Sequence, residues 1–159
     1  MKPRITFLSE KKLIGYKQNM NYAIYNPALV WQSFMPRKKE IMNAIGTDLF
    51  SVQLYPEYFW EKFNPTKDFE KWAAIEVTDF HTIPANMNTL VIPNGWYAVF
   101  DYKGDASDAA DFFSSIFNTW LPNSDYLLDN RPHFEILGKK YKKDDPNSEE
   151  EIWIPIRSK

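Results

Sequence analysis

Residues 149–156 at the end of the chain alternate between two kinds of side chain, a pattern that predicts a β-strand. Every isoleucine of this segment falls on one face, which suits packing against a hydrophobic core. The opposite face combines Glu151, Trp153 and Pro155, which is an unusual combination for residues packed in a hydrophobic core. We therefore expect this strand to carry a core on one side and a binding surface on the other.

Alternating or short apolar runs between turn residues predict further strands along the chain. These strands span residues 4–8, 12–20, 50–55, 69–77, 89–92, 96–102 and 133–137. Residues 56–68 are predicted to form an aromatic-rich loop, and residues 139–147 a charged hairpin. Strands therefore dominate the predicted secondary structure.

Two segments have the apolar spacing of an amphipathic helix. The first is expected to begin at Asn26 as N-cap with Pro27 in the first turn, and to stop at Gly46. Pro36 interrupts its apolar stripe, so we expect a kink or a restart there, because proline cannot donate the backbone hydrogen bond. The second helix is predicted from residue 107 or 108 to about 120.

The two halves of the chain, about 4–79 and 88–157, follow the same order of strand, helix, strand and strand. A Glu-x-Trp tripeptide recurs in the last strand of each half, at 70–72 and at 151–153. Identity between the halves is otherwise poor, so the duplication rests on the order and spacing of the elements. We therefore infer that the chain contains an internal repeat.

This repeat predicts an α+β fold in which residues 1–159 form a single domain. Two β-α-β-β units would pair about a pseudo-twofold axis into an antiparallel sheet, with the helices on one face. The other face is expected to form a ligand cleft. Glu70, Trp72, Glu151 and Trp153 would be arranged there around the axis.

The aromatic content is the unusual feature of the composition, with 12 Phe, 9 Tyr and 6 Trp residues, or 17% of the chain. Such rings suit a pocket for flat, apolar ligands, although an aromatic-rich core explains them equally well. The net charge of -2 argues against direct binding of nucleic acid through phosphate contacts, but leaves a local basic patch open.

Several kinds of site are absent from the sequence. Without cysteine there are no disulfides, thiolate metal sites or cysteine nucleophiles. The only histidines, His81 and His133, lack the spacing of zinc ligands, and no glycine-rich phosphate loop or serine nucleophile motif occurs. We expect no metal and no cofactor. No segment has the length of a signal peptide or membrane span, so we expect a cytoplasmic protein without a membrane partner.

Both halves contain recognisable segments, which are residues 34–37, 70–77, 92–100, 120–124, 131–135 and 150–156. Together they resemble the GyrI-like family, also known as the bacterial transcription activator effector-binding family. The resemblance covers nearly the whole chain and includes no catalytic signature. It implies a duplicated strand-helix-strand-strand unit with a ligand cleft on the sheet face opposite the helices.

The resemblance also implies a range of functions. Family modules fused to a DNA-binding domain bind effectors, often aromatic cations, which face a buried glutamate on the last strand. Glu151 is the matching residue here. Some stand-alone relatives inhibit DNA gyrase, and others hydrolyse cyclopropane-containing genotoxic compounds with a pocket glutamate. The module fills this chain and leaves no room for a helix-turn-helix domain, so we expect no DNA-binding regulator in this chain alone.

Glu151 is the main candidate for a ligand-binding residue. A carboxylate among aromatic rings is poorly solvated, so its pKa should rise, and it could pair with a cation or act as a general base on water. The alternative is a solvated glutamate at a strand edge. The other ligand-binding candidates are Trp153, Trp72, Tyr97, Glu70 and Trp31. Core packing is the alternative for the aromatic residues, and pairing with Lys67 or Lys71 is the alternative for Glu70.

Three functions fit these observations. The first is a stand-alone module that senses or sequesters hydrophobic, often cationic small molecules. The second is a hydrolase of strained electrophiles in the same cleft, with Glu151 and Tyr97 as the catalytic residues. The third is a protein-interaction role, such as modulation of gyrase or of a separate transcription regulator, whose partner the sequence leaves open.

Overall fold

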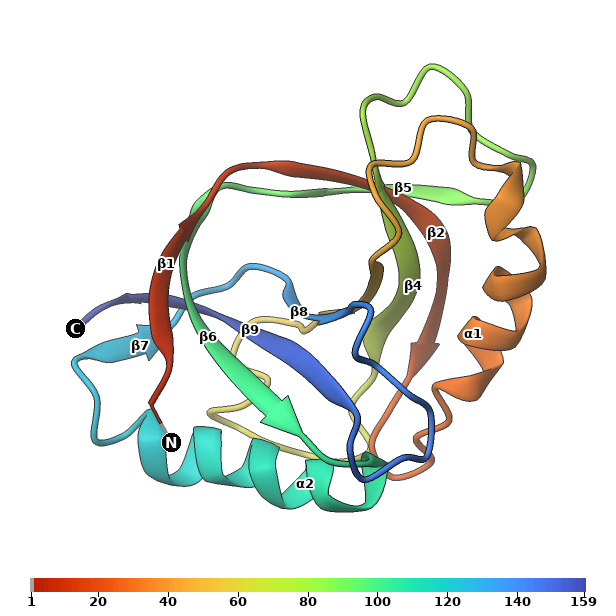
Figure 1. The fold of residues 1–159 in the computed structure, drawn as a ribbon. Coiled ribbons are helices and arrows are strands. Elements are labelled where there is room, and N and C mark those ends of the chain that lie inside the picture. Colours follow the sequence, from red (N-terminus) through yellow and green to blue (C-terminus); the bar gives the residue numbers. More distant parts are fainter. Residues whose placement is uncertain (1) are drawn as a thin grey trace.

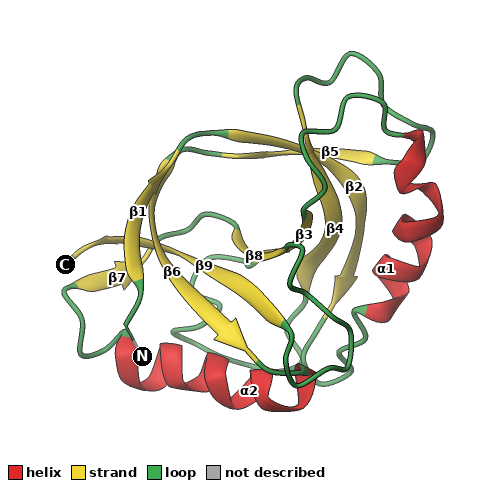
Figure 2. Ribbon diagram, viewed as in Figure 1, coloured by secondary structure: helices red, strands yellow, loops and turns green. Residues whose placement is uncertain are grey.

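The computed structural model describes residues 2–159, apart from the side chains of Ala106 and Ser107, and is built around a nine-stranded antiparallel sheet (Figures 1 and 2). The strands are β1 (Arg4–Leu8), β2 (Lys11–Met20), β3 (Leu49–Leu54), β4 (Phe69–Val77), β5 (Asn88–Ile92), β6 (Gly95–Lys103), β7 (Tyr126–Leu128), β8 (His133–Leu137) and β9 (Glu149–Ser158). Their order across the sheet is β1-β6-β9-β8-β3-β4-β2-β5, and β7 pairs with β9. The predicted α+β class and antiparallel sheet are confirmed.

Each helix changes its winding towards its C-terminal end. Helix α1 (Ala28–Phe34) continues as a 3₁₀ segment (Met35–Glu40), and α2 (Ala106–Ser115) continues as a π-helical turn (Ile116–Trp120). The expected break at Pro36 is confirmed as the start of the 3₁₀ segment, because proline has no N–H for the α-helical bond. The expected helix end at Gly46 is wrong, since the backbone is already extended at residue 41.

The two halves of the chain exchange their leading strands. Strand β1 pairs with β6 of the second half, and β5 pairs with β2 of the first half. The halves also meet in the centre of the sheet, where β3 pairs with β8. The register preserves the repeat, because Val52 lies opposite Trp72 just as Phe134 lies opposite Trp153. Neither half therefore contains a complete sheet of its own.

The face of the sheet that carries Trp72 and Trp153 is the inner side of a curled sheet and is filled by a hydrophobic core. In Figure 1 the sheet bends so that β1 and β6 stand opposite β2 and β5, with the helices outside. Side chains from both ends and from the middle of the sheet meet inside, including Leu8, Leu13, Phe50, Val52, Ile92, Tyr97, Val99 and Phe134. The ring of Phe134 stacks on that of Trp153 at 5.3 Å between centroids.

The helices pack on the outer face, one at each end of the sheet. Helix α1 covers β2 and β4 through Val30 and Phe34, which contact Ile14 and Ile75 in one buried cluster. Helix α2 and its π-helical turn cover β6 and β9, and the isoleucines of β9 are buried beneath them, as the alternation predicted. The central strands β3 and β8 lie between these two clusters. Within residues 2–159, no helix is long and apolar enough to cross a membrane.

Candidate functional site

A large cavity of about 1760 Å³ opens on the outer face, over the central strands and between the two helices. Its walls include Trp31 from α1 and Phe113 and Ser114 from α2, and its floor comes from β3 and β8. The structure thus corrects the expected position of the cleft, which was the face opposite the helices. The reason is that the curled sheet closes on its inner face, and the tryptophans expected to line a cleft fill that interior instead.

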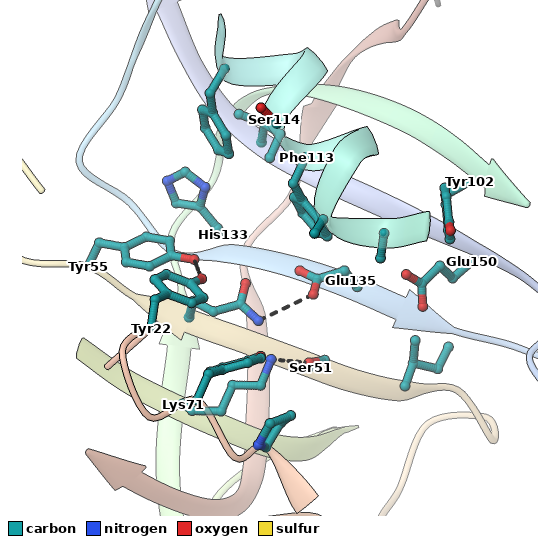
Figure 3. A pocket seen from close by; sticks show the side chains of 18 of the residues that line it. Tyr22, Ser51, Tyr55, Lys71, Tyr102, Phe113, Ser114, His133, Glu135 and Glu150 are labelled. Carbon is teal, nitrogen blue, oxygen red and sulfur yellow. Dashed lines mark hydrogen bonds between the residues drawn. The ribbon is translucent and has the colours of Figure 1, made fainter. Parts of the chain in front are cut away.

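Polar side chains form the floor of the cavity although they are buried. Strands β3 and β8 pair Ser51 with Glu135 and Gln53 with His133, so all four side chains point to the outer face. Lys71 of β4 joins this row (Figure 3). The Gln53 Nε2 donates to Glu135 Oε1 at 3.3 Å, and the Lys71 Nζ donates to Ser51 Oγ at 2.6 Å. A buried polar row in a sheet is unusual and marks this region as a candidate binding surface.

Two carboxyl groups, those of Glu135 and Glu150, lie near each other below α2 (Figure 3). Burial raises the pKa of Glu135, and Lys71 and the bond from Gln53 partly oppose that rise. Burial, together with repulsion by Glu135, raises the pKa of Glu150 to about 7. The carboxyl group of Glu150 therefore gains and loses its proton near neutral pH, because burial outweighs the opposing charge of Lys71.

The 56–68 loop closes one end of the cavity with aromatic rings. The Trp60 ring stacks on Phe117 of the π-helical turn at 4.4 Å and on Phe63 at 5.4 Å between centroids. Beside this stack, the hydroxyls of Tyr22 and Tyr55 share a hydrogen bond of 2.5 Å. Flat apolar walls above a polar floor are the usual construction of a pocket for aromatic ligands.

His133 sits at the same end of the floor, where the Tyr55 ring meets it edge-on at 4.8 Å. Burial, with a smaller contribution from the charge of Arg131, lowers the pKa of His133 to about 3. The imidazole is therefore neutral at physiological pH. In the described part of the chain, no group of three or more His, Cys, Asp or Glu side chains is arranged to hold a metal ion.

Among the residues singled out from the sequence, Trp31 lines the cavity. Glu151 lies on the opposite face of β9, where its side chain is 39% exposed, and its Oε1 accepts a 3.1 Å hydrogen bond from Trp153 Nε1. Its Oε2 pairs with Arg4 at 3.1 Å. Glu70 repeats this arrangement and accepts from Trp72 Nε1 at 3.0 Å. The duplicated Glu-x-Trp tripeptide thus forms a duplicated local hydrogen bond beside the inner core.

Tyr97 is also part of the inner core. Its side chain is fully buried, and its hydroxyl donates to the carbonyl of Pro132 at 2.7 Å. Burial raises its pKa well above the usual range. The Tyr97 hydroxyl is thus occupied by a hydrogen bond inside the core, and Tyr97 is not among the residues that line the cavity.

The polar floor was missed by the sequence analysis, although a signal for it existed. In β3 the apolar Phe50 and Val52 alternate with Ser51 and Gln53, and β8 alternates in the same way. Central strands with one polar face indicate that something other than a helix covers that face. In β9, Trp153 points to the inner core, so alternation places Glu150 on the side of the groove and Glu151 on the opposite side.

Comparison with known proteins agrees with this architecture. The GyrI-like small molecule binding domain family matches residues 1–157. The transcriptional regulator BrlR of Pseudomonas aeruginosa is 27% identical over 128 residues, which are 80% of this chain and 45% of BrlR. The chain thus spans less than half the length of that relative.

Solved structures share the fold at low sequence identity. The structure of SAV2435 bound to tetraphenylphosphonium superposes with a TM-score of 0.69 at 17% identity, covering 99% of this chain and 94% of SAV2435. A hydrolase encoded by lin2189 from Listeria innocua superposes with a TM-score of 0.60 at 13% identity, covering 98% of this chain and 92% of the hydrolase. At these identities the likeness concerns the fold.

Proposed function

Because the chain belongs to the GyrI-like small-molecule-binding family, we propose that its outer groove binds aromatic, lipophilic, cationic molecules and so senses or sequesters them. The observation that carries the proposal is the pair of carboxyl groups, Glu135 and Glu150, enclosed by aromatic rings on the floor of this groove. A carboxylate in such a place attracts a cation far more strongly than one in water.

The charges of the floor favour one positive charge on the ligand. Lys71 faces two carboxyl groups, so the floor has one negative charge in excess when both Glu135 and Glu150 are ionised. Trp31 and Phe113 line the cavity with aromatic rings, which suit an apolar cation. The tetraphenylphosphonium in SAV2435 is a lipophilic cation of this kind, which supports the same ligand class for the present groove.

The test is calorimetric titration with tetraphenylphosphonium, whose charge does not depend on pH. We expect Glu150→Gln to weaken binding by about tenfold, since loss of ~1.4 kcal/mol has that effect. Glu151→Gln is the matched control, because it removes the neighbouring carboxylate from the opposite face of the same strand. Unchanged affinity in both Glu150→Gln and Glu135→Gln would contradict the proposal. A loss of affinity in Glu151→Gln alone would instead favour Glu151 as the ligand-binding glutamate.

Hydrolysis of strained electrophiles is a second candidate, favoured by the unlike environments of Glu135 and Glu150. A carboxylate can take a proton from water while the water oxygen attacks a ring carbon of an activated cyclopropane. The ring C–C bond then breaks, and its electron pair moves to the conjugated carbonyl, which takes a proton from the second carboxyl group. Incubation with a cyclopropane-bearing alkylator should yield more than one hydrated, ring-opened product per protein molecule, and Glu150→Gln should abolish turnover. Stoichiometric loss without turnover would oppose this activity.

A further inference from the structure

Lys71 places a positive charge in the floor of a groove that we assign to cations. Its side chain is only 2% exposed, and its Nζ donates to Ser51 Oγ at 2.6 Å. The ammonium also lies 5.8 Å from the centre of the Tyr25 ring. Such burial of a lysine is rare unless the charge has a partner, so its position needs an explanation.

The simplest explanation, a counterion for Glu135, is incomplete. Lys71 attracts the charges of Glu135 and Glu150 from a distance, but among the described residues it forms no ion pair. An ammonium has three N–H donors, and Ser51 accepts one of them. The ammonium therefore retains donor capacity beside the cavity that it helps to line.

The ammonium of Lys71 and the carboxyl group of Glu150 lie towards opposite sides of the floor, with Glu135 between them. Lys71 is on β4 and Ser51 is on β3, whereas Glu135 is on β8 and Glu150 is on β9. The Nζ of Lys71 reaches Ser51 of β3, and Ser51 lies directly opposite Glu135 of β8. Since neighbouring strands are about 4.8 Å apart, the ammonium lies one strand spacing from the Glu135 position, and the β3 and β9 positions of Ser51 and Glu150 are separated by roughly 10 Å at the backbone. That separation matches the length of a small fused-ring molecule with a charged group at each end.

Building on the proposed function, we propose that the groove prefers zwitterionic aromatic ligands, whose cationic amine lies at Glu150 and whose carboxylate lies at Lys71 and Ser51. The carboxylate would complete the hydrogen bonding of the ammonium with a charge-assisted bond. A ligand that carries only the cation leaves Lys71 without this partner. The groove thereby discriminates between an aromatic acid and its ester, which differ only at this end.

The test compares rhodamine B, which carries a cationic ring system and a carboxylate, with its ethyl ester, which is a cation only. Binding is followed by fluorescence anisotropy. We expect Lys71→Met to weaken binding of rhodamine B by about tenfold and to leave or improve binding of the ester. Lys71→Arg should retain the preference for rhodamine B over its ester. Ser51→Ala should reduce this preference, but by less than Lys71→Met does. Lys17→Met, a surface lysine on β2, should change neither affinity.

The ratio of the two affinities is measured within each variant, so a partial loss of folded protein cancels. If Lys71→Met leaves this ratio unchanged while Glu150→Gln still weakens binding of the ester, the zwitterion proposal fails and the cation-binding function stands. If the wild-type protein binds neither dye nor tetraphenylphosphonium, both proposals fail.

Discussion

At the scale of single residues, the assignment of the site turns on which of two adjacent glutamates faces the cavity. Side chains alternate across a strand, so Glu150 and Glu151 point to opposite faces of β9. Glu151 is tied to Arg4 and to the Trp153 indole outside the cavity. Glu150 has the burial and the raised pKa that the sequence analysis expected of a ligand-binding glutamate, and Glu135 adds to the rise.

Affinity for a permanent cation should depend on pH through Glu150. Its pKa of about 7 means that the carboxyl group is mostly protonated at pH 6 and mostly ionised at pH 8. Because the cation favours the ionised form, the affinity for tetraphenylphosphonium should rise up to about tenfold over this range, with release of a proton on binding. Titration in buffers of different ionisation enthalpy measures that proton. In Glu150→Gln the affinity should not change over this pH range. An affinity that is also independent of pH in the wild-type protein would rule out this role of Glu150.

Ionisation of Glu150 should lower the stability of the folded protein as the pH rises, whereas it raises the affinity for the cation. The pKa of Glu150 is raised in the folded state from its usual 4.5 to about 7, so folding favours the protonated form. Its contribution to stability is fully present below pH 4.5 and is lost as pH rises through 7. Glu150→Gln should therefore raise the free energy of unfolding at pH 8 by roughly 1–3 kcal/mol and change it little at pH 4. Urea unfolding at both pH values measures this, and equal effects at both would contradict it.

At the scale of elements, the 56–68 loop and the π-helical turn after α2 form one end of the groove together. Their contact is the stack of Trp60 on Phe117, between segments that lie far apart in the chain. The loop has no strand or helix of its own, so its position depends on such ring contacts.

Trp60→Ala should loosen this end of the groove. Loss of the indole removes contacts with Phe117 and Phe63, and we expect affinity for tetraphenylphosphonium to fall by about fivefold to tenfold. Amide hydrogen exchange should become faster across residues 56–68. Trp96→Ala is the control, since Trp96 is 53% exposed and contacts Phe7 at the other end of the sheet. Slow exchange in the loop of Trp60→Ala would show that other contacts hold it.

At the scale of the whole molecule, the exchanged strands make the sheet depend on both halves of the chain. The edge strands β1 and β5 each pair with the other half, and the inner core draws on β1, β3, β6 and β8 at once. Contacts of this kind are distant in sequence and must form together, so we expect one cooperative unfolding transition.

Splitting the chain in the loop between β4 and β5, at residue 80, provides the test. Neither fragment alone can pair its edge strand or cover its share of the inner core, so each should lack stable structure by circular dichroism. An equimolar mixture should regain the sheet spectrum and the binding of tetraphenylphosphonium. A fragment that folds cooperatively by itself would show that the repeat units are independent.

The sequence by itself was sufficient for much of this fold. The alternation in 69–77 and 133–137 predicted β4 and β8 with their observed bounds, and the repeat predicted matching Glu-x-Trp strands in one antiparallel sheet. These features follow from local chemistry, because the period of a strand and the helix-breaking effect of Pro36 act over a few residues. Strand β7 was missed, since three residues are too few to show a period.

The location of the site was decided only by the tertiary structure. Both faces of β9 combine apolar and acidic side chains, so its alternation identifies two faces without saying which one is enclosed. The curl of the sheet brings β1, β5 and the central strands around Trp72 and Trp153, which close the inner face as a core. The helices cover only the two ends of the outer face, and the uncovered polar strip of β3 and β8 becomes the floor of the groove. Curvature and coverage depend on contacts between distant segments, which a local pattern does not contain.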